Sequence, residues 1–254
     1  MKELNMSIDA LTGTIELADL PENMEILHLY RNNLDGTLDL DALPACMRNV
    51  FLSANNFTGE ISLSHLPEGI DSVCLNANLL RGTICLTSLP PALVELHLNQ
   101  NTFEGSLDLT RLPESLKTLC VNGNMFSGDI DIGHLPAGLT YLGAANNRLG
   151  GTISLTSLPS ALKTLHLNQN AFEGSLDFTA IPESLEGLRL SDNHFSGEIN
   201  IRHLRGRLAN MDVRNNRLCG TVLVPPRFFT WIGSSWSVNQ FGGNNDLTVE
   251  RLTL

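Results

Sequence analysis

The sequence is short of basic residues and has no long hydrophobic run. Sixteen lysines and arginines stand against 27 aspartates and glutamates, which gives a net charge of −11. Phosphate binding needs a basic surface, so nucleic acid is disfavoured as a partner. No stretch reaches the roughly 18 apolar residues of a membrane-spanning helix, and the first residues lack the apolar core of a signal peptide.

Cysteine is scarce as well, and its distribution is irregular. Five cysteines, an odd number, are scattered with no cluster at either end of the chain. Disulfide-stapled domains use paired cysteines, so this pattern favours a reducing compartment and predicts a cytoplasmic protein. An extracellular surface location stays open if the chain is part of a longer protein.

What the sequence does contain is a 23-residue unit repeated without insertion or deletion. The clearest copy spans 89–111 and reads LPPALVELHLNQNTFEGSLDLTR. Equivalent units begin at Leu20, Leu43, Leu66, Leu89, Leu112, Leu135, Leu158, Ile181 and Leu204. A period of this length is typical of a solenoid, in which each repeat packs only on its neighbours. We predict a solenoid over 1–226, with a partial repeat at 1–19 and nine full repeats at 20–226.

The pattern within one unit predicts how each coil folds. Alternating apolar residues predict a strand over 95–99 in the clearest copy, and a second short strand over 105–109. Asn101 has an equivalent in every full repeat, which predicts inward-facing amides that bond neighbouring coils. Gly105 has an equivalent in all ten copies, which indicates a backbone conformation or a close approach that a Cβ would block.

The segment from Leu93 to Phe103, L-x-x-L-x-L-x-x-N-x-F, resembles the leucine-rich repeat consensus. The resemblance implies an α/β-type repeat that is mostly β: a right-handed solenoid with a parallel sheet on its concave face, and short turns and second short strands elsewhere. The Leu-Pro head, the 23-residue length and the Ile-Asp-Leu after the glycine look most similar to leucine-rich repeat proteins of kinetoplastid protozoa.

The last residues, 227–254, do not repeat. This segment holds the aromatic residues Phe228, Phe229, Trp231, Trp236 and Phe241. A solenoid needs its last open core face covered, so we predict a C-terminal cap, with an aromatic partner-binding segment as the alternative. The N-terminal end has no such cover, which predicts either more chain upstream or stacking on another chain.

No catalytic motif or metal site is predicted. Nucleotide-binding loops, H-E-x-x-H and G-x-S-x-G are all absent from the sequence. Six of the seven histidines form two sets whose members lie 69 residues, or three repeats, apart, which indicates duplication of a three-repeat block. Members of one set would lie about 14 Å apart, too far to share an ion. We therefore expect no cofactor and no enzyme activity.

Charge divides unevenly between the two outward surfaces of the predicted coil. On the strand side, seven acids and seven bases cancel, whereas the residues around the invariant glycine carry eleven acids against Arg81 alone. This acidic flank predicts either a solubilising surface that keeps exposed strand edges unpaired, or a docking strip for a basic partner. A weak cation site where Asp108 and Asp131 stack is a variant of the second possibility.

Aromatic residues and arginine usually dominate protein interfaces, and few of them fall on the predicted strand side. The candidate partner-binding residues are Ile26, His28, Tyr30, Arg31, Arg48, Phe51 and Tyr141. They predict a protein–protein interaction scaffold, with a contact centre near Tyr30 and Phe51; a harmless scatter of variable residues is the alternative. A structural module that self-associates through its N-terminal end, and an extracellular adhesion or receptor ectodomain, are the competing functions.

Overall fold

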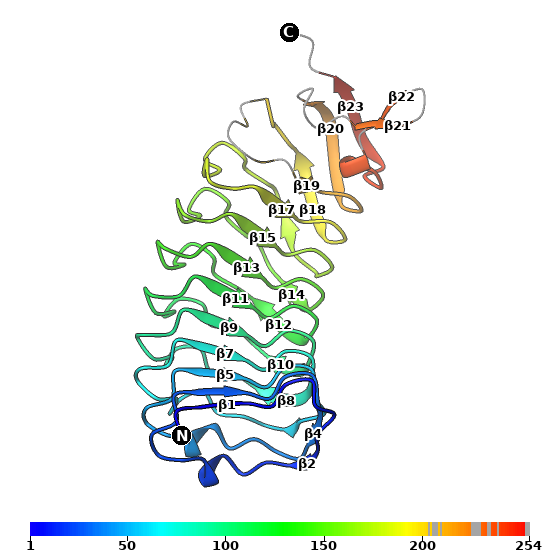
Figure 1. Ribbon diagram of the computed structural model, residues 1–254. Helices are drawn as coiled ribbons and strands as arrows, with labels where there is room; N and C mark the ends of the chain where they lie inside the picture. The colour runs from blue at the N-terminus through cyan, green and yellow to red at the C-terminus, as the bar shows by residue number, and fades with distance from the viewer. Residues whose placement is uncertain are drawn as a thin grey trace.

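The computed structural model describes residues 1–202, 204, 208, 210–224, 230–232, 235–237 and 239–251. Successive coils stack along one axis, with the two termini at opposite ends (Figure 1). One strand from each coil joins a ten-stranded parallel sheet that follows the stack. In order, its strands are β1 (Glu3–Asn5), β3 (Ile26–His28), β5 (Asn49–Phe51), β7 (Ser72–Cys74), β9 (Glu95–His97), β11 (Thr118–Cys120), β13 (Tyr141–Gly143), β15 (Thr164–His166), β17 (Gly187–Arg189) and β19 (Asn210–Asp212). The predicted mostly-β parallel solenoid is confirmed.

The strands of this sheet are shorter than the sequence predicts. In the copy at 89–111, the strand covers Glu95–His97 and not 95–99. Leu96 and Leu98 are both fully buried, as the alternation requires. The chain turns away after Leu98 because Gln100 adopts a left-handed conformation with φ 58°. Each strand therefore presents only two or three outward side chains, and columns of such side chains run along the stack.

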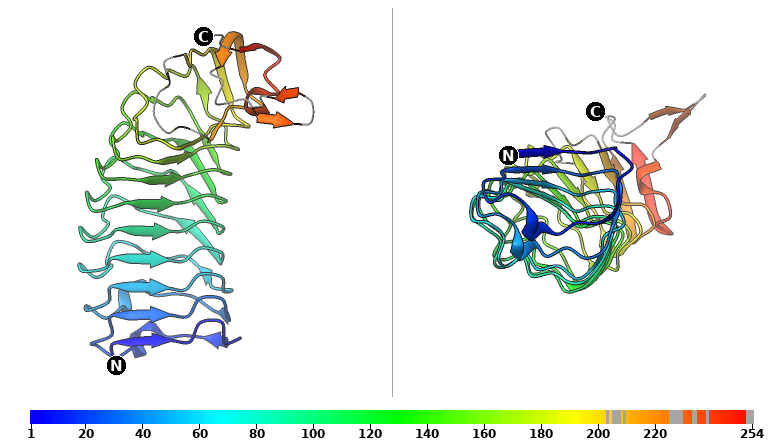
Figure 2. Two further views of the ribbon diagram at one scale, coloured as in Figure 1. Left: turned by 45° about the horizontal axis from the view of Figure 1, so that its top comes forward. Right: turned by 60° about the horizontal axis from the view of Figure 1, so that its bottom comes forward.

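A second set of short strands lies elsewhere on each coil. They are β2 (Thr12–Thr14), β4 (Asn33–Asp35), β6 (Thr58–Gly59), β8 (Leu79–Thr83), β10 (Thr102–Gly105), β12 (Met125–Asp129), β14 (Arg148–Gly150), β16 (Glu173–Gly174), β18 (His194–Glu198), β20 (Arg217–Val224) and β23 (Asp246–Arg251). Short 3₁₀ turns lie at η1 (Leu17–Asp19), η2 (Leu40–Ala42) and η4 (Asn239–Phe241). Figure 2 shows both sets of strands following the same curved stack.

The second strand in the copy at 89–111 ends where we predicted that it would begin. Gly105 closes β10, and the predicted strand over 105–109 is wrong. The φ of 85° at Gly105 does not by itself end the strand, because Gly220, with φ 79°, lies inside β20, which pairs with β23 as far as Val224. The alternation that suggested a strand still holds for burial, since Leu107 and Leu109 are buried while Asp108 is exposed.

Two physical constraints meet at Gly105. Its positive φ is one that L-residues rarely adopt. A Cβ at this position would also lie 2.9 Å from Cγ2 of Thr83, a residue of the preceding coil. In most coils the outward side chain after the invariant glycine fills the space above the glycine of the next coil, but Gly13, Gly128 and Gly197 are not crowded. The positive φ is the constraint that all ten glycines share.

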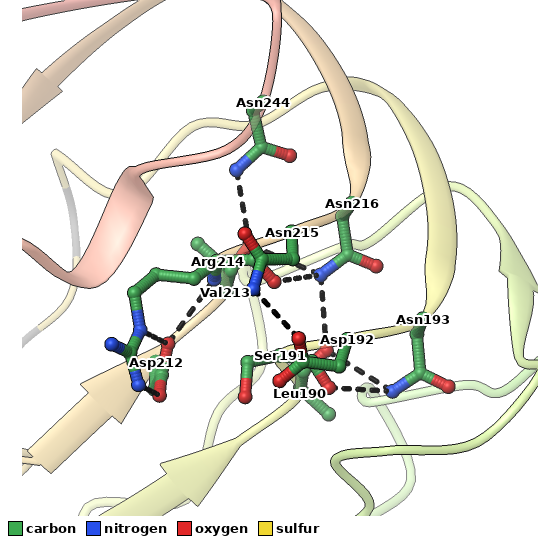
Figure 3. A network of polar contacts seen from close by, with 10 residues as sticks. All are labelled: Leu190, Ser191, Asp192, Asn193, Asp212, Val213, Arg214, Asn215, Asn216 and Asn244. Carbon is green, nitrogen blue, oxygen red and sulfur yellow. Dashed lines mark hydrogen bonds and ion pairs between the residues drawn. The ribbon is translucent and has the colours of Figure 1, made fainter.

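The predicted asparagine ladder is confirmed. Nδ2 of Asn101 donates to the carbonyl oxygens of Leu75 (3.0 Å) and Leu98 (3.1 Å), and its Oδ1 accepts from the backbone N–H of Leu80 (3.1 Å). One side chain thus satisfies backbone groups of two coils, since Leu75 and Leu80 belong to the coil before. Figure 3 shows amides of the same ladder near the C-terminus, where Nδ2 of Asn216 donates to the carbonyl of Leu190 and Nδ2 of Asn244 donates to that of Val213.

Asn244 shows that part of the non-repeating tail forms a further coil. Its Oδ1 accepts from the N–H of Leu218, and its Nδ2 donates to the carbonyls of Val213 and Phe241. It follows Asn216 by 28 residues and not 23, so the sequence period conceals it. Strand β23 pairs in parallel with β20, and Phe241 is buried at 2% exposure.

The rest of the tail is only partly described. Strands β21 (Thr230–Ile232) and β22 (Ser235–Ser237) form an antiparallel pair. Phe228 and Phe229 lie outside the described residues. The division at 226/227 and the capping role of 227–254 stay predictions.

Candidate partner-binding face

The outward side chains of the ten-stranded sheet, here called the strand face, include one group of stacked aromatic rings. His28 of β3 and Phe51 of β5 are direct cross-strand partners. Their rings lie parallel, with centroids 4.7 Å apart and an angle of 11° between planes. Tyr30 meets His28 edge-on at 6.2 Å and 72°. The structure therefore brings together the core of the predicted contact centre, which we call the aromatic cluster: Ile26, His28, Tyr30 and Phe51.

The aromatic cluster is neither buried nor fully exposed. All four of its residues have intermediate exposure. Parallel strands hold the rings in register, and stacking restrains them, so few rotamers are lost when a partner binds. This half-exposed apolar surface on a rigid support is suited to a protein contact.

Arginines flank the aromatic cluster, as predicted, and both are exposed. Arg31 follows β3 in a left-handed conformation with φ 56°. Arg48 precedes β5, and its guanidinium lies 3.7 Å from a carboxylate oxygen of Asp71. This pair is well exposed and worth little to stability, about 0.5 kcal/mol or less. Arg48 can therefore exchange its partner for an incoming carboxylate at small cost.

Tyr141 does not belong to the aromatic cluster. It lies in β13, four strands beyond β5 in the sheet order, or about 19 Å away at the usual strand spacing. Its ring meets His166 edge-on at 5.6 Å and its hydroxyl lies 3.3 Å from Nδ1 of that residue. Gly143 makes room, because a Cβ there would lie 2.8 Å from Cε1 of Tyr141. The seven candidate partner-binding residues therefore lie at two separate positions on the strand face.

Between the two places, the middle of the strand face holds Cys74, His97 and Cys120 on adjacent strands. Burial raises the pKa of Cys74 to about 12 and that of Cys120 to about 11, so both thiols stay protonated at neutral pH. Burial also lowers the pKa of His97, despite nearby Glu95. Within the described residues, no group of three or more His, Cys, Asp or Glu side chains is placed to hold a metal ion.

A polar hollow that no sequence pattern predicted lies at the C-terminal end of the strand face. It measures about 440 Å³ and lies over β17, β19 and the coil formed by the tail. Its lining residues are Asn168, Gln169, Arg189, Ser191, Asp192, Asn210, Met211, Asp212, Arg214 and Gln240. Only Met211 is apolar, so the hollow differs chemically from the aromatic cluster.

An internal ion pair organises the hollow (Figure 3). Arg214 donates from Nε and from its terminal NH2 to the two carboxylate oxygens of Asp212, at 2.9 and 2.7 Å. Burial opposes ionisation of Asp212, but the hydrogen bonds from Arg214 outweigh it and lower the pKa of the carboxyl. Asp192 accepts from Nδ2 of Asn215 at 2.6 Å. Two of the four charged side chains therefore neutralise each other.

Two carboxylates of the acidic flank, those of Asp108 and Asp131, have local structural partners. Oδ1 of Asp108 accepts from the backbone N–H of Thr110 at 2.9 Å and from its hydroxyl at 2.6 Å. Asp131 accepts from the N–H of Gly133 at 2.8 Å and contacts Nδ1 of His134 at 2.7 Å. These bonds lower the pKa of both carboxyls. Such turn-stabilising bonds favour the structural role of the flank, and the docking strip stays a prediction.

Comparison with known proteins identifies the fold. No protein-family model and no curated protein sequence matches the chain. Among solved structures, the leucine-rich repeat ectodomain of the Arabidopsis receptor kinase HAESA is 25% identical, with a TM-score of 0.69 over 98% of this chain and 50% of that one. This chain has the leucine-rich repeat fold. The narrower resemblance to kinetoplastid proteins stays a prediction.

Two further leucine-rich repeat neighbours and one other structure support the same fold. The plant peptide hormone receptor RGFR1, solved with RGF2, is 23% identical, with a TM-score of 0.69 over 100% of this chain and 45% of that one. YopM from Yersinia enterocolitica is 24% identical, with a TM-score of 0.56 over 100% and 60%. A plant ice-binding protein is 23% identical, with a TM-score of 0.72 over 97% and 80%. The leucine-rich repeat chain spans about half the length of the two plant receptors.

Among the described residues of this leucine-rich repeat chain, no helix has the length and hydropathy needed to cross a bilayer. All five cysteines are free thiols, and Cys46 and Cys85 are exposed.

Proposed function

We propose that this chain is a non-enzymatic module that binds another protein or a peptide through the strand face, with the aromatic cluster as the contact centre. The stacked pair of His28 and Phe51, half-exposed on adjacent strands and flanked by Arg31 and Arg48, carries the proposal. Aromatic rings and arginines held on a rigid surface are the residues that most often dominate binding energy.

The solved neighbours support a binding role in general. RGFR1 is bound to the peptide RGF2, and HAESA is bound to the peptide hormone IDA, in the structures that resemble this chain. In this chain, the preformed sheet holds columns of outward side chains that can serve such a binding role. The partner's identity does not follow from the fold, because the variable columns determine it.

Affinity capture followed by titration of the recovered partner tests the proposal. Three proteins are compared: the unaltered chain, the double variant Tyr30→Ala/Phe51→Ala, and Tyr141→Ala as a control on the same face. We expect the double variant to lose at least 30-fold in affinity, about 2 kcal/mol, and Tyr141→Ala to lose less than threefold. Equal affinity of the double variant and the unaltered chain would refute the contact centre.

A second candidate is assembly through the N-terminal end of the stack, and the surface of the first coil favours it. Met1 and Ile8 are 61% and 63% exposed, and an apolar hollow of about 280 Å³ lies among Leu4, Met6 and neighbouring core residues. Light scattering of the chain as given separates the two candidates. Assembly predicts a defined oligomer that Ile8→Asp dissociates, whereas a monomer at all concentrations excludes it.

The proposed compartment is the cytoplasm, on the basis of the five free thiols. Mass analysis of the native protein tests it. Asn56 begins the glycosylation sequon Asn56-Phe57-Thr58. Five free thiols and an unmodified Asn56 are the expected result, while a disulfide or a glycan at Asn56 would favour the ectodomain alternative.

A further inference from the structure

The N-terminal end of the stack presents core residues that the described part of the chain leaves uncovered. In the second coil, Leu27 and Leu29 are 0% and 5% exposed. Their equivalents in the first coil are Leu4, which is half-buried, and Met6, which is 39% exposed. The apolar hollow of about 280 Å³ at this end also includes Leu11, Ile15, Leu17 and Leu20. It therefore offers apolar side chains that a ligand can cover.

Strand β1 adds an open strand edge at the same end. It is the first strand in the order of the ten-stranded sheet and lies at the end of the stack (Figure 1). The carbonyl of Lys2 and the N–H of Met6 form hydrogen bonds with the segment that contains β3. Backbone groups of successive residues point to opposite sides of a strand, so those of Glu3 and Asn5 face the open side. Such an edge can accept one more strand from another chain.

The first coil, residues 1–19, carries four carboxylates and one basic side chain. The acids are Glu3, Asp9, Glu16 and Asp19, and the base is Lys2. The ammonium group of Lys2 pairs with Glu25 of the second coil. All four acids are exposed, so this end of the stack is negative.

Two of these carboxylates belong to the hollow itself. Glu16 and Asp19 line it, and neither side chain forms an ion pair or a hydrogen bond within the described residues. In the second coil, Asp39 is the equivalent of Glu16, and its Oδ1 accepts from the N–H of Asp41 at 3.1 Å. The carboxylates of Glu16 and Asp19 lack such a local partner, so they remain available to attract a cationic ligand.

Charge distinguishes between the possible occupants of this end. The same end of a second copy would bring four more carboxylates against these, and an acidic peptide or an anionic lipid surface would also be repelled. A neutral apolar segment would desolvate Glu16 and Asp19 without supplying a counter-charge. A segment that alternates basic and apolar residues meets each requirement, because alternate side chains of a strand point to opposite faces.

We infer that the N-terminal end binds an extended segment of another protein in which basic and apolar residues alternate, and that this segment adds a strand to the open edge of β1. Its apolar side chains enter the hollow, and its basic side chains lie within the field of Glu3, Glu16 and Asp19. The surface is the one named for the second candidate function, but the occupant is a basic partner and not a second copy.

Fluorescence anisotropy with a labelled heptapeptide, fluorescein-Lys-Leu-Lys-Leu-Lys-Leu-Lys-amide, tests this binding. The full chain is used at about 0.15 M salt, where distant charges are screened. A polar twin carries serine in place of leucine, and an acidic twin carries glutamate in place of lysine. We expect the parent peptide to bind at least tenfold more tightly than either twin. Undetectable binding of the parent, or equal binding by either twin, would overturn the inference.

Two double variants locate the site. Glu16→Gln/Asp19→Asn is expected to weaken binding of the parent peptide at least fivefold. The matched control, Glu104→Gln/Glu173→Gln, removes two exposed charges from β10 and β16 and is expected to change affinity less than twofold. Equal effects of the two double variants would show attraction to the overall charge and would contradict the site.

N-methylated peptides test the added strand. One form carries N-methyl groups on the leucines and the other on the lysines, so each loses the hydrogen-bond donors of one edge. A strand paired with β1 uses one edge, so we expect one form to bind about tenfold more weakly and the other within threefold of the parent. Equal affinities of the two forms would overturn strand addition. These assays use neither the captured partner nor the oligomeric state, so a negative result is distinguishable from failure of either proposed function.

Discussion

The two ends of the ten-stranded sheet share one backbone but present opposite chemistry. At β3 and β5, stacked rings of His28 and Phe51 form an apolar patch. At β17 and β19, the equivalent column holds Arg189 and Asp212, within a polar hollow. The inward residues are nearly the same at both ends, since Leu27 and Leu188 are each fully buried. Within each coil, the inward residues thus build the core, and the outward residues determine the chemistry of the surface.

The largest expected effect comes from breaking the scaffold that both regions share. Asn101→Leu removes the side chain that satisfies Leu75, Leu80 and Leu98. The N–H of Leu80 loses its side-chain acceptor, while the carbonyls of Leu75 and Leu98 each lose one of two amide donors and keep those of Asn78 and Asn124. We therefore expect a loss of about 3 kcal/mol in the free energy of unfolding. Urea unfolding followed by far-ultraviolet circular dichroism measures it. A loss below about 1 kcal/mol would mean that the ladder is not what holds adjacent coils together.

A smaller effect is expected at the invariant glycines, where two constraints can be separated: the positive φ and the close approach of a side chain from the preceding coil. Gly105 and Gly128 have similar φ values of 85° and 81°. A Cβ at Gly105 would lie 2.9 Å from Thr83, whereas one at Gly128 would lie 3.8 Å from Ser106. We expect Gly128→Ala to cost about 1–2 kcal/mol for the left-handed conformation alone, and Gly105→Ala to cost about 1 kcal/mol more because of the overlap.

The double variant Gly105→Ala/Thr83→Ala is the control for the previous prediction. Removing Cγ2 of Thr83 relieves the overlap but not the backbone strain, so its stability should approach that of Gly128→Ala. Equal destabilisation by Gly105→Ala and Gly128→Ala would show that conformation alone selects the glycine.

The smallest effect concerns pH and the histidines of the strand face. Burial lowers the pKa of His97 and of His166, and Arg189 adds to the shift at His166. Neutral imidazoles therefore contribute stability above the unfolded value of about 6.5. This stability is lost as pH falls through the folded pKa values.

We expect the thermal midpoint to fall between pH 7 and pH 5, by an amount that corresponds to less than about 1 kcal/mol. The double variant His97→Gln/His166→Gln should flatten the profile in this range. If the variant keeps the full pH dependence, other groups are responsible for it.

The repeating parts of this molecule could be predicted from the sequence because every coil needs the same residue types at the same positions. The 23-residue period, the inward leucines, the asparagine ladder and the glycine column all recur at fixed spacing. The strand limits were less predictable. Alternation in 105–109 reflects burial of Leu107 and Leu109. Whether strand pairing continues past the glycine differs between coils, since β10 ends at Gly105 whereas β20 pairs with β23 as far as Val224.

The candidate sites were predictable to different degrees. His28 and Phe51 fall in one column at adjacent repeats, so register alone brings them together. The polar hollow is lined in part by Gln240 of the tail. The ladder asparagine of that segment, Asn244, follows Asn216 by 28 residues and not 23, so the period does not mark it. One sequence signal in the tail, an asparagine flanked by apolar residues, would have indicated Asn244.

The most direct test of the separation between fold and recognition measures two quantities on two variants. Phe51→Ala and Gly105→Ala are assayed for unfolding free energy and for affinity to the captured partner. We predict at least a tenfold loss of affinity for Phe51→Ala with less than about 1 kcal/mol of destabilisation. Gly105→Ala should show the reverse, losing stability with affinity kept within twofold. Unchanged affinity in Phe51→Ala, or parallel losses of both quantities in both variants, would contradict the account.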